Sequence, residues 1–403
     1  MSWLRRMWSR KFDQSSDDDY YREIQIPRFF LATSGIWTEH VKTNRIRFSI
    51  FVTILILFAA LPRLLGLFTI VNENQLFYQI GSLLFYVNVI CAMFLLRFNS
   101  DIRRSVLAEM RDDWETTHDV EDKQVMQYYA EYSRKVSLLV ITVRGVSLIG
   151  KFRSLNPLIT SIIRGDNMST GKKKYPFLPS GTFFDTVSSI CYLIARIVST
   201  VTMIGIDTFF AILTIHTCGQ LVILAKRITR YRGQTHHQFG ENIPRTCSCL
   251  KCIVDSHVRI CDFVKRIDNY FYIVFFMRLL VGVIDLACSG FELSKAIAKG
   301  EYAYLMTFVI STLSTSSTFL INCSVAETCQ QAGYALGDAA YSVEWITKQP
   351  RILRHLIFII RQTRLPLKFT AGKYFILSRS LFKEYFLTAM SYISTLITIK
   401  LGK

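Results

Sequence analysis

A group of cysteine and histidine residues in the middle of the chain has the side chains that zinc ions prefer. The group consists of Cys247, Cys249 and Cys252, with His236, His237 and His257 nearby. Against a metal site, the Cys-x-Cys-x-x-Cys spacing matches no standard zinc finger or ribbon. A cytosolic loop that keeps its thiols reduced explains the same residues. We therefore expect no metal ion and no cofactor.

A second group of residues, near the C-terminus, places hydroxyls on one face of a helix. Ser391, Ser394, Thr395 and Thr398 follow the spacing i, i+3, i+4 and i+7. In an apolar helix such a stripe faces protein or water rather than lipid. Two interpretations remain open: the hydroxyls bond across a contact between helices, or several copies of the stripe line a pore around a symmetry axis.

The sequence contains none of the common catalytic motifs that we looked for. We find no Walker loop, no HExxH and no GxSxG, and the seven histidines form no repeated His-box. Asp207 and Asp285 are the main acidic residues within apolar segments, and no inverted repeat is evident, which disfavours a proton-coupled transporter. We expect a protein that is not an enzyme.

The composition places these groups on membrane helices. Of the 403 residues, 51% are hydrophobic and only 19% are charged, fewer charges than soluble domains of this size carry. The net charge of +18 does not indicate nucleic-acid binding, because the basic residues are interleaved with apolar segments. The chain is predicted to be an all-α membrane protein that crosses the bilayer several times.

Seven apolar runs are long enough to span a bilayer. They lie at about 48–70, 76–97, 136–155, 183–207, 271–294, 303–324 and 379–400. The third run is the weakest, since it contains Arg144 and Lys151. An odd number of spans puts the two termini on opposite sides of the membrane.

The distribution of basic residues orients the seven helices. Lys and Arg number 32 in one set of alternating segments and 8 in the other. The positive-inside rule therefore predicts a cytoplasmic N-terminus and an extracellular C-terminus. Asn167 begins a glycosylation sequon in a segment that this topology places outside. A second sequon, at Asn322, falls inside a span and is taken to have no meaning.

Several spans keep an apolar helical pattern beyond the length that a bilayer needs. We infer a cytoplasmic helical anchor domain, built from the ends of the fourth, fifth and sixth spans plus a short helix before the seventh. The alternative is a set of helices lying on the inner leaflet. The predicted regions are a cytoplasmic N-terminal segment 1–47, spans one to four at 48–207, anchor segment 208–270, spans five and six at 271–324, anchor segment 325–377, and the last helix with its tail at 378–403.

Four stretches of the chain resemble the insect odorant receptors. They run from Gly205 to Leu224, from His257 into the fifth span, from Asn322 to Trp345, and from Gly372 to Tyr392. The chain looks like a ligand-specific tuning subunit of a hymenopteran-like group, because it lacks the long second cytoplasmic loop of the shared co-receptor. The resemblance implies a plasma-membrane protein of olfactory sensory neuron dendrites. It also implies an odorant-gated, non-selective cation channel, formed as a heterotetramer with the co-receptor.

The resemblance also implies positions for the pore and the odorant. The implied pore and gate residues, all on the last helix, are Ser391, Thr395, Thr398 and Ile399. The implied odorant-binding residues, in the outer half of the membrane, are Tyr78, Phe85, Tyr86, Ser147, Gly150, Tyr192, Met306, Thr307 and Ile310. Two alternatives are a gustatory receptor, although the Gln-Phe pair of that family is absent from the last helix, and a secondary transporter.

Overall fold

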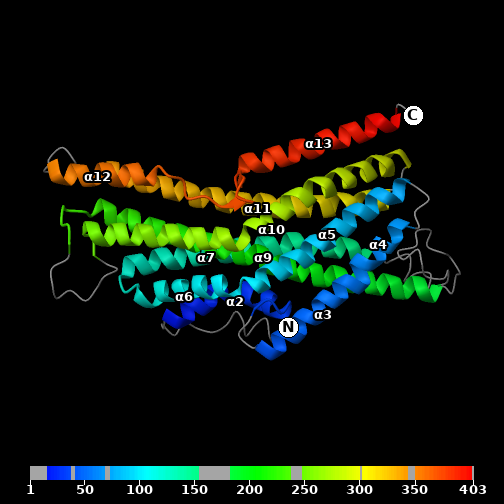
Figure 1. Cartoon of the computed structure of the whole chain (residues 1–403), viewed down its shortest axis with the longest axis horizontal. Helices are drawn as coiled ribbons and strands as arrows, with labels where there is room; N and C mark the ends of the chain where they lie inside the picture. Colours follow the sequence, from blue (N-terminus) through cyan, green and yellow to red (C-terminus); the bar gives the residue numbers. More distant parts are fainter. Residues whose placement is uncertain are drawn as a thin grey trace.

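A computed structural model describes residues 16–37, 41–68, 73–153, 182–236, 247–299, 302–343 and 350–401. These residues form helices almost throughout, with one short hairpin (Figure 1). In chain order the elements are α2 Ser16–Thr33, α3 Val41–Leu55, the π-helix η1 Ile56–Ala60, α4 Leu61–Phe68, α5 Glu73–Phe98, α6 Ser100–Thr116, α7 Val120–Arg153, α9 Thr182–Thr229, α10 Leu250–Lys299, α11 Tyr302–Tyr341, α12 Pro350–Thr363, β1 Thr370–Ala371, β2 Phe375–Ile376 and α13 Arg379–Leu401.

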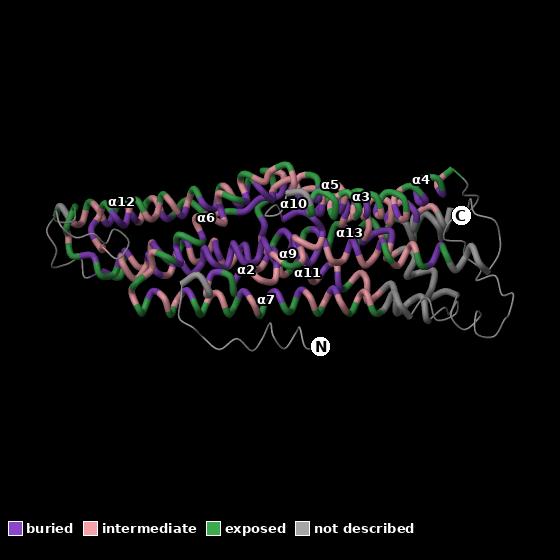
Figure 2. Tube along the Cα trace, turned by 90° about the horizontal axis from the view of Figure 1, so that it is seen from below, coloured by how far each residue is buried: buried purple, intermediate pink, exposed green. Residues whose placement is uncertain are grey.

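Helix α9 forms the centre of the bundle. It packs against α7, α11, α2 and α10, and in its most apolar part 83% of the residues are buried. Small residues let its neighbours approach closely: a Cβ atom added at Gly205 would lie 2.9 Å from the side chain of Leu31 on α2. Figure 2 shows the buried residues concentrated along the middle of the bundle. A polar residue on α9 must therefore find its partners within the protein.

The two longest helices exceed the thickness of a membrane. At about 1.5 Å per residue, α9 with 48 residues and α10 with 50 residues are about 72 and 75 Å long. The hydrocarbon core is only about 30 Å thick. In Figure 1 the far ends of both helices lie beside α12 at one end of the molecule, whereas α4 and α13 reach the other end. This arrangement agrees with helices that continue past the bilayer, as their apolar pattern predicts.

Five of the described helical segments are long and apolar enough to cross a membrane. They are Thr43–Phe68, Gln79–Phe98, Val187–Thr229, Leu250–Gly290 and Val309–Tyr341. The remaining two predicted spans correspond to parts of α7 and α13, which are continuous helices of 34 and 23 residues but are less apolar. α7 is less apolar because it carries several charged side chains. One of them, Arg144, has a buried partner.

A short hairpin joins α12 to α13 and fixes the start of the last helix. Three residues connect the paired Ala371 and Phe375, and two of them, Gly372 and Lys373, have left-handed φ angles of 66° and 68°. These are the φ angles of the two central residues of a type I′ turn, and the backbone N–H of Tyr374 closes the turn by donating to the carbonyl of Ala371 at 3.3 Å. The hairpin is held on α10, because Asp268 accepts hydrogen bonds from the backbone N–H of Thr370 at 2.6 Å and from its hydroxyl at 2.8 Å. Lys373 forms an ion pair with the same carboxylate.

The N-terminal region contains a structured helix. α2 packs along α9 and contacts α6 and α7. Its residues Ile24 and Leu31, and Ile36 just after its end, are almost completely buried. From the sequence, this stretch was predicted only as part of the cytoplasmic N-terminal segment 1–47, with no helix assigned to it. Close contact with α9 nevertheless makes α2 part of the core.

Candidate functional site

Four helices meet around one buried carboxylate. Asp207 on α9 is fully buried and forms an ion pair with Arg144 on α7 at 3.0 Å. Its other oxygen bonds to Arg278 on α10 and accepts a hydrogen bond from Nδ2 of Asn322 on α11 at 2.9 Å. Burying an unpaired charge is very unfavourable, so these contacts explain how an acid is accommodated in an apolar helix. We refer to these four residues as the Asp207 network.

The Asp207 network was not predicted as a unit, although its members were visible. Arg144 and Asp207 each stood out as ionisable residues in apolar segments, and such residues usually pair with one another. This general rule was the signal in the sequence that could have predicted the ion pair between them. Asn322 was noted only as part of a glycosylation sequon that falls inside a span and was taken to have no meaning. Its complete burial agrees with that interpretation. With two guanidinium groups and one carboxylate, the network carries a net positive charge.

The predicted odorant-binding residues are only partly brought together. Phe85 on α5 and Tyr192 on α9 lie in one group of side chains, because the Arg196 guanidinium is 4.8 Å from the centroid of the Phe85 ring and Arg63 is 5.2 Å from that of Tyr192. Tyr192 and Arg196 are one turn apart on α9. Arg63 and Arg196 were not among the residues predicted from the sequence, and they make this predicted apolar region partly cationic.

The other predicted odorant-binding residues are placed less closely. Tyr86 is buried, whereas Ser147 on α7 and Ile310 on α11 are half-buried. No described contact joins Ser147 or Ile310 to Phe85. The side chains of Tyr78, Gly150, Met306 and Thr307, and the predicted glycosylation site Asn167, lie outside the described part of the chain. The assignment of all nine residues to an odorant site stays a prediction.

The predicted pore residues lie on an exposed face of α13. Ser391, Thr395 and Thr398 are exposed, while the side chain of Ile399 lies outside the described residues. The hydroxyl of Thr395 donates to the backbone carbonyl of Ser391 at 3.0 Å, and that of Thr398 donates to Ser394 at 2.9 Å. Within the described residues these hydroxyls bond to their own helix, not to a neighbouring one.

The opposite face of α13 packs on α10 and α11. The hydroxyl of Tyr385 donates to the carbonyl of Gly282 at 3.1 Å, and its ring lies 5.1 Å from that of Phe319. The N-terminus of α13 is fixed by Glu327 on α11, which accepts a hydrogen bond from the backbone N–H of Arg379 at 2.7 Å. A movement of α10 or α11 would therefore act on α13 through several direct contacts.

A second buried polar cluster joins α2, α6 and α9. His216 on α9 lies between Glu23 and Asp113, with ring nitrogen to carboxylate distances of 3.5 and 3.3 Å. Trp114 donates to Glu23 at 2.8 Å, and Arg259 on α10 pairs with Asp113. Burial by itself would raise the pKa of Asp113, but the hydrogen bond from His216 and the charge of Arg259 keep this pKa below its ordinary value.

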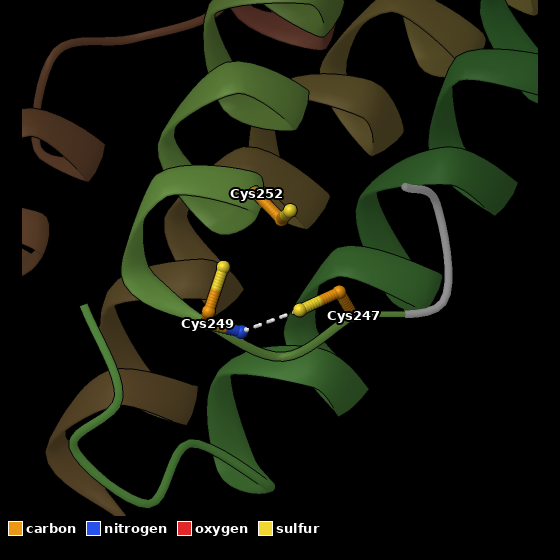
Figure 3. A group of neighbouring side chains, drawn as sticks. All are labelled: Cys247, Cys249 and Cys252. Atoms are coloured by element: carbon orange, nitrogen blue, oxygen red, sulfur yellow. Dashed lines mark hydrogen bonds between the residues drawn. The ribbon is translucent and has the colours of Figure 1, made fainter. Parts of the chain in front are cut away.

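Two further features bear on ligands. An open hollow of about 580 Å³ lies along α10 and is lined mainly by charged side chains, which do not suit an apolar molecule. Its lining residues are Asp255, Val258, Arg259, Asp262 and Arg266. Nearby, the three cysteines of the Cys-x-Cys-x-x-Cys sequence form a compact group at the start of α10 (Figure 3).

Solved structures of known proteins share the fold. The insect olfactory receptor OR5 from Machilis hrabei matches with a TM-score of 0.79 and 16% identity, over 95% of this chain and 100% of that one. The structure of the same receptor in complex with eugenol also matches with a TM-score of 0.79, at 15% identity, over 95% of this chain and 98% of that one. At such low identity these matches concern the fold alone.

Known proteins with similar sequences are also odorant receptors. Odorant receptor 13a of Drosophila melanogaster is 23% identical over 211 residues, a segment that covers 49% of this chain and 49% of that protein. Odorant receptor 10 of Aedes albopictus is 21% identical over 325 residues, covering 75% of this chain and 81% of its own length. The chain thus spans about half the length of the first of these relatives.

The family model described as 7tm odorant receptor matches residues 74–390, most of the chain. The chain belongs to the insect odorant receptor family, and the resemblance found in the sequence is confirmed.

Proposed function

We propose that this chain is the odorant-binding subunit of a ligand-gated, non-selective cation channel, assembled as a heterotetramer with a co-receptor subunit. The observation that carries the proposal is the exposed hydroxyl face of α13. A membrane helix that turns Ser391, Thr395 and Thr398 away from its own bundle needs other subunits or water on that side. Copies of α13 around a symmetry axis supply both.

The odorant binds on the outer side of the bundle, near Phe85 and Tyr192. These aromatic side chains suit a small, mostly apolar molecule. Arg63 and Arg196 add hydrogen-bond donors beside the two rings. The best ligands of this site are therefore volatile molecules that combine an apolar body with an acceptor oxygen. The structure of the Machilis hrabei receptor with eugenol supports binding of a small molecule of this kind by the fold.

Opening follows from a ligand that binds the open arrangement more tightly than the closed one. The contacts of Tyr385 with α10 and of Arg379 with α11 carry a shift of these helices to α13. The last helix then moves away from the axis, and Na⁺, K⁺ and Ca²⁺ pass. The channel acts in the plasma membrane of olfactory sensory neuron dendrites, with the N-terminus inside and Asn167 glycosylated outside.

Whole-cell current during an odorant panel tests this function. Cells express the chain alone, an insect co-receptor alone, or both. We expect fast cation currents that depend on the odorant only in cells with both subunits. Concentrative substrate uptake without such currents would instead indicate a transporter, and currents evoked by tastants through this chain alone would indicate a gustatory-type channel.

Mutation of the proposed odorant site gives a second test. Phe85→Ala removes a ring that lies against Arg196, so the odorant concentration for half-maximal current should rise at least about tenfold, which corresponds to about 1.4 kcal/mol of binding. Ion selectivity should stay unchanged, since α13 is untouched. An unchanged concentration dependence at equal surface expression would contradict the placement of the site.

A further inference from the structure

Three thiols converge where α10 begins. The sulfur atoms of Cys247, Cys249 and Cys252 all lie within 4.8 Å of one another. Cys249 and Cys252 are one helical turn apart, so they share a face, and the backbone N–H of Cys249 donates to the sulfur of Cys247 at 3.4 Å. Figure 3 shows the three side chains gathered around the first turn of the helix. Cys249 and Cys252 are buried and Cys247 is half-buried.

The surrounding backbone holds this first turn in place. The carbonyls of Gln234 and Thr235, in the segment after α9, accept hydrogen bonds from Leu250 at 2.9 Å and from Lys251 at 3.2 Å. In the same segment, Tyr231 is buried and its hydroxyl lies 3.1 Å from Nδ1 of His355 on α12. The thiols therefore sit at a joint between three helices, where the positions of the ligands are fixed by main-chain contacts.

The distances suit a tetrahedral thiolate site. A Zn–S bond of about 2.3 Å in tetrahedral geometry separates two sulfur atoms by about 3.8 Å. Sulfur atoms within 4.8 Å of one another reach this spacing by movements of about 1 Å or less.

We propose that Cys247, Cys249 and Cys252 bind a zinc ion. Each thiol releases one proton when its sulfur coordinates the metal, so binding releases three protons and forms three Zn–S bonds without any oxidation or reduction. Three thiolates leave the fourth tetrahedral position for water or for a histidine such as His236, which is exposed and follows Thr235 in the chain. The ion stabilises the joint between α9, α10 and α12.

This inference departs from the expectation of no metal. The expectation rested on linear spacing, which matches no standard zinc motif. Spacing ignores the conformation of the chain before α10, where the half-buried Cys247 accepts a hydrogen bond from the backbone N–H of Cys249 and lies beside two buried thiols. Soft thiolate ligands in tetrahedral geometry select Zn²⁺ over Mg²⁺ or Ca²⁺.

Metal content and cobalt substitution test the site. The full-length chain is purified in detergent under reducing conditions, and zinc is measured by mass spectrometry for the wild type, the Cys249→Ser/Cys252→Ser variant, and Cys261→Ser as the matched control. Cys261 is a half-buried thiol on the same helix, outside the group. We expect one zinc per chain in the wild type and in the control, and loss of that zinc in the double variant. Replacement by Co²⁺ should produce thiolate-to-metal charge-transfer absorption with the same pattern.

A second measurement avoids dependence on the folding of a variant. In the wild type, zinc should protect all three cysteines from alkylation, and a chelator should expose them, as read by peptide mass spectrometry. Zinc content equal in the wild type and the double variant would overturn the proposal. So would alkylation of Cys247, Cys249 and Cys252 at rates that zinc does not change, or an isolated protein in which two of them form a disulfide.

Discussion

The Asp207 network and the hydroxyl face of α13 both place polar side chains on apolar helices, but they satisfy them differently. Asp207 is fully buried and bonds to three other helices of the same chain. Thr395 and Thr398 are exposed and bond to the backbone of their own helix. The first arrangement joins helices of the same chain, whereas the second leaves a polar surface that can contact molecules outside the chain.

This difference separates structural from functional polar residues in a membrane bundle. A buried charge whose partner is removed becomes very costly, so its effect should appear in stability. An exposed hydroxyl that bonds to its own helix contributes little to stability, so its effect should appear in what passes along that surface. Four changes test the distinction, beginning with the largest expected loss of stability.

Asp207→Leu should have the largest effect, because it leaves Arg144 and Arg278 buried without their carboxylate. Breaking a buried pair in this way costs about 3 to 5 kcal/mol. We expect loss of surface expression and a large fall in the thermal unfolding temperature of the purified chain. Asp101→Asn is the matched control, since the Asp101 side chain is 92% exposed. Surface expression of Asp207→Leu equal to that of the control would contradict a structural role.

Asp113→Asn should have an intermediate effect that depends on pH. The substitution weakens the bonds to His216 and Arg259, at a cost of about 2 kcal/mol for hydrogen bonds to charged groups. Because the folded-state pKa of Asp113 is lowered, its contribution is fully present above the unfolded pKa of about 3.9 and is lost as pH falls through the folded value.

The free energy of unfolding, measured against pH in detergent, checks this prediction. The difference between wild type and Asp113→Asn should be constant near neutral pH and should shrink below about pH 4. A difference that grows as the pH falls would show that the sign of the pKa shift is wrong.

Gly205→Ala should have a smaller effect, at the contact between α9 and α2. The new methyl group would lie 2.9 Å from Leu31 and 3.1 Å from Phe30, so α2 must shift, at a cost of about 1 kcal/mol. Gly145→Ala is the matched control, because a Cβ atom there meets nothing within 4 Å. In that helix the alanine should instead raise stability, by up to about 1 kcal/mol. Equal effects of the two substitutions on the unfolding temperature would contradict close packing of α2.

Much of the fold could be predicted from the sequence, because long apolar runs identify membrane helices without knowledge of their neighbours. α9 and α10 illustrate this, since their apolar pattern continues as unbroken helices of 48 and 50 residues. α2 was missed as part of the core. Its place depends on contact with Gly205, which is a property of two helices together and leaves no period in the sequence of one.

The candidate sites could be predicted less well. The hydroxyl face of α13 follows from helical spacing alone, and Thr395 and Thr398 do lie on an exposed face. The odorant-binding residues depend in addition on the rotation and depth of several helices, which spacing does not supply. Arg63 and Arg196 were missed for that reason, as was the pairing of Arg144 with Asp207. The three cysteines were noted in the sequence, but the convergence of their sulfur atoms depends on the conformation of the chain at the start of α10.

The most direct test of the distinction combines stability and selectivity in one variant. Thr395→Val/Thr398→Val removes two hydroxyls and keeps the shape of the side chains, and it should change the free energy of unfolding by no more than about 0.5 kcal/mol per site. In cells that also express a co-receptor, the reversal potential of the odorant-evoked current in mixed ionic solutions should shift, because the proposed function places these hydroxyls along the ion path. An unchanged reversal potential together with a large loss of stability would contradict the account, since it would make the hydroxyl face of α13 a structural contact like the Asp207 network.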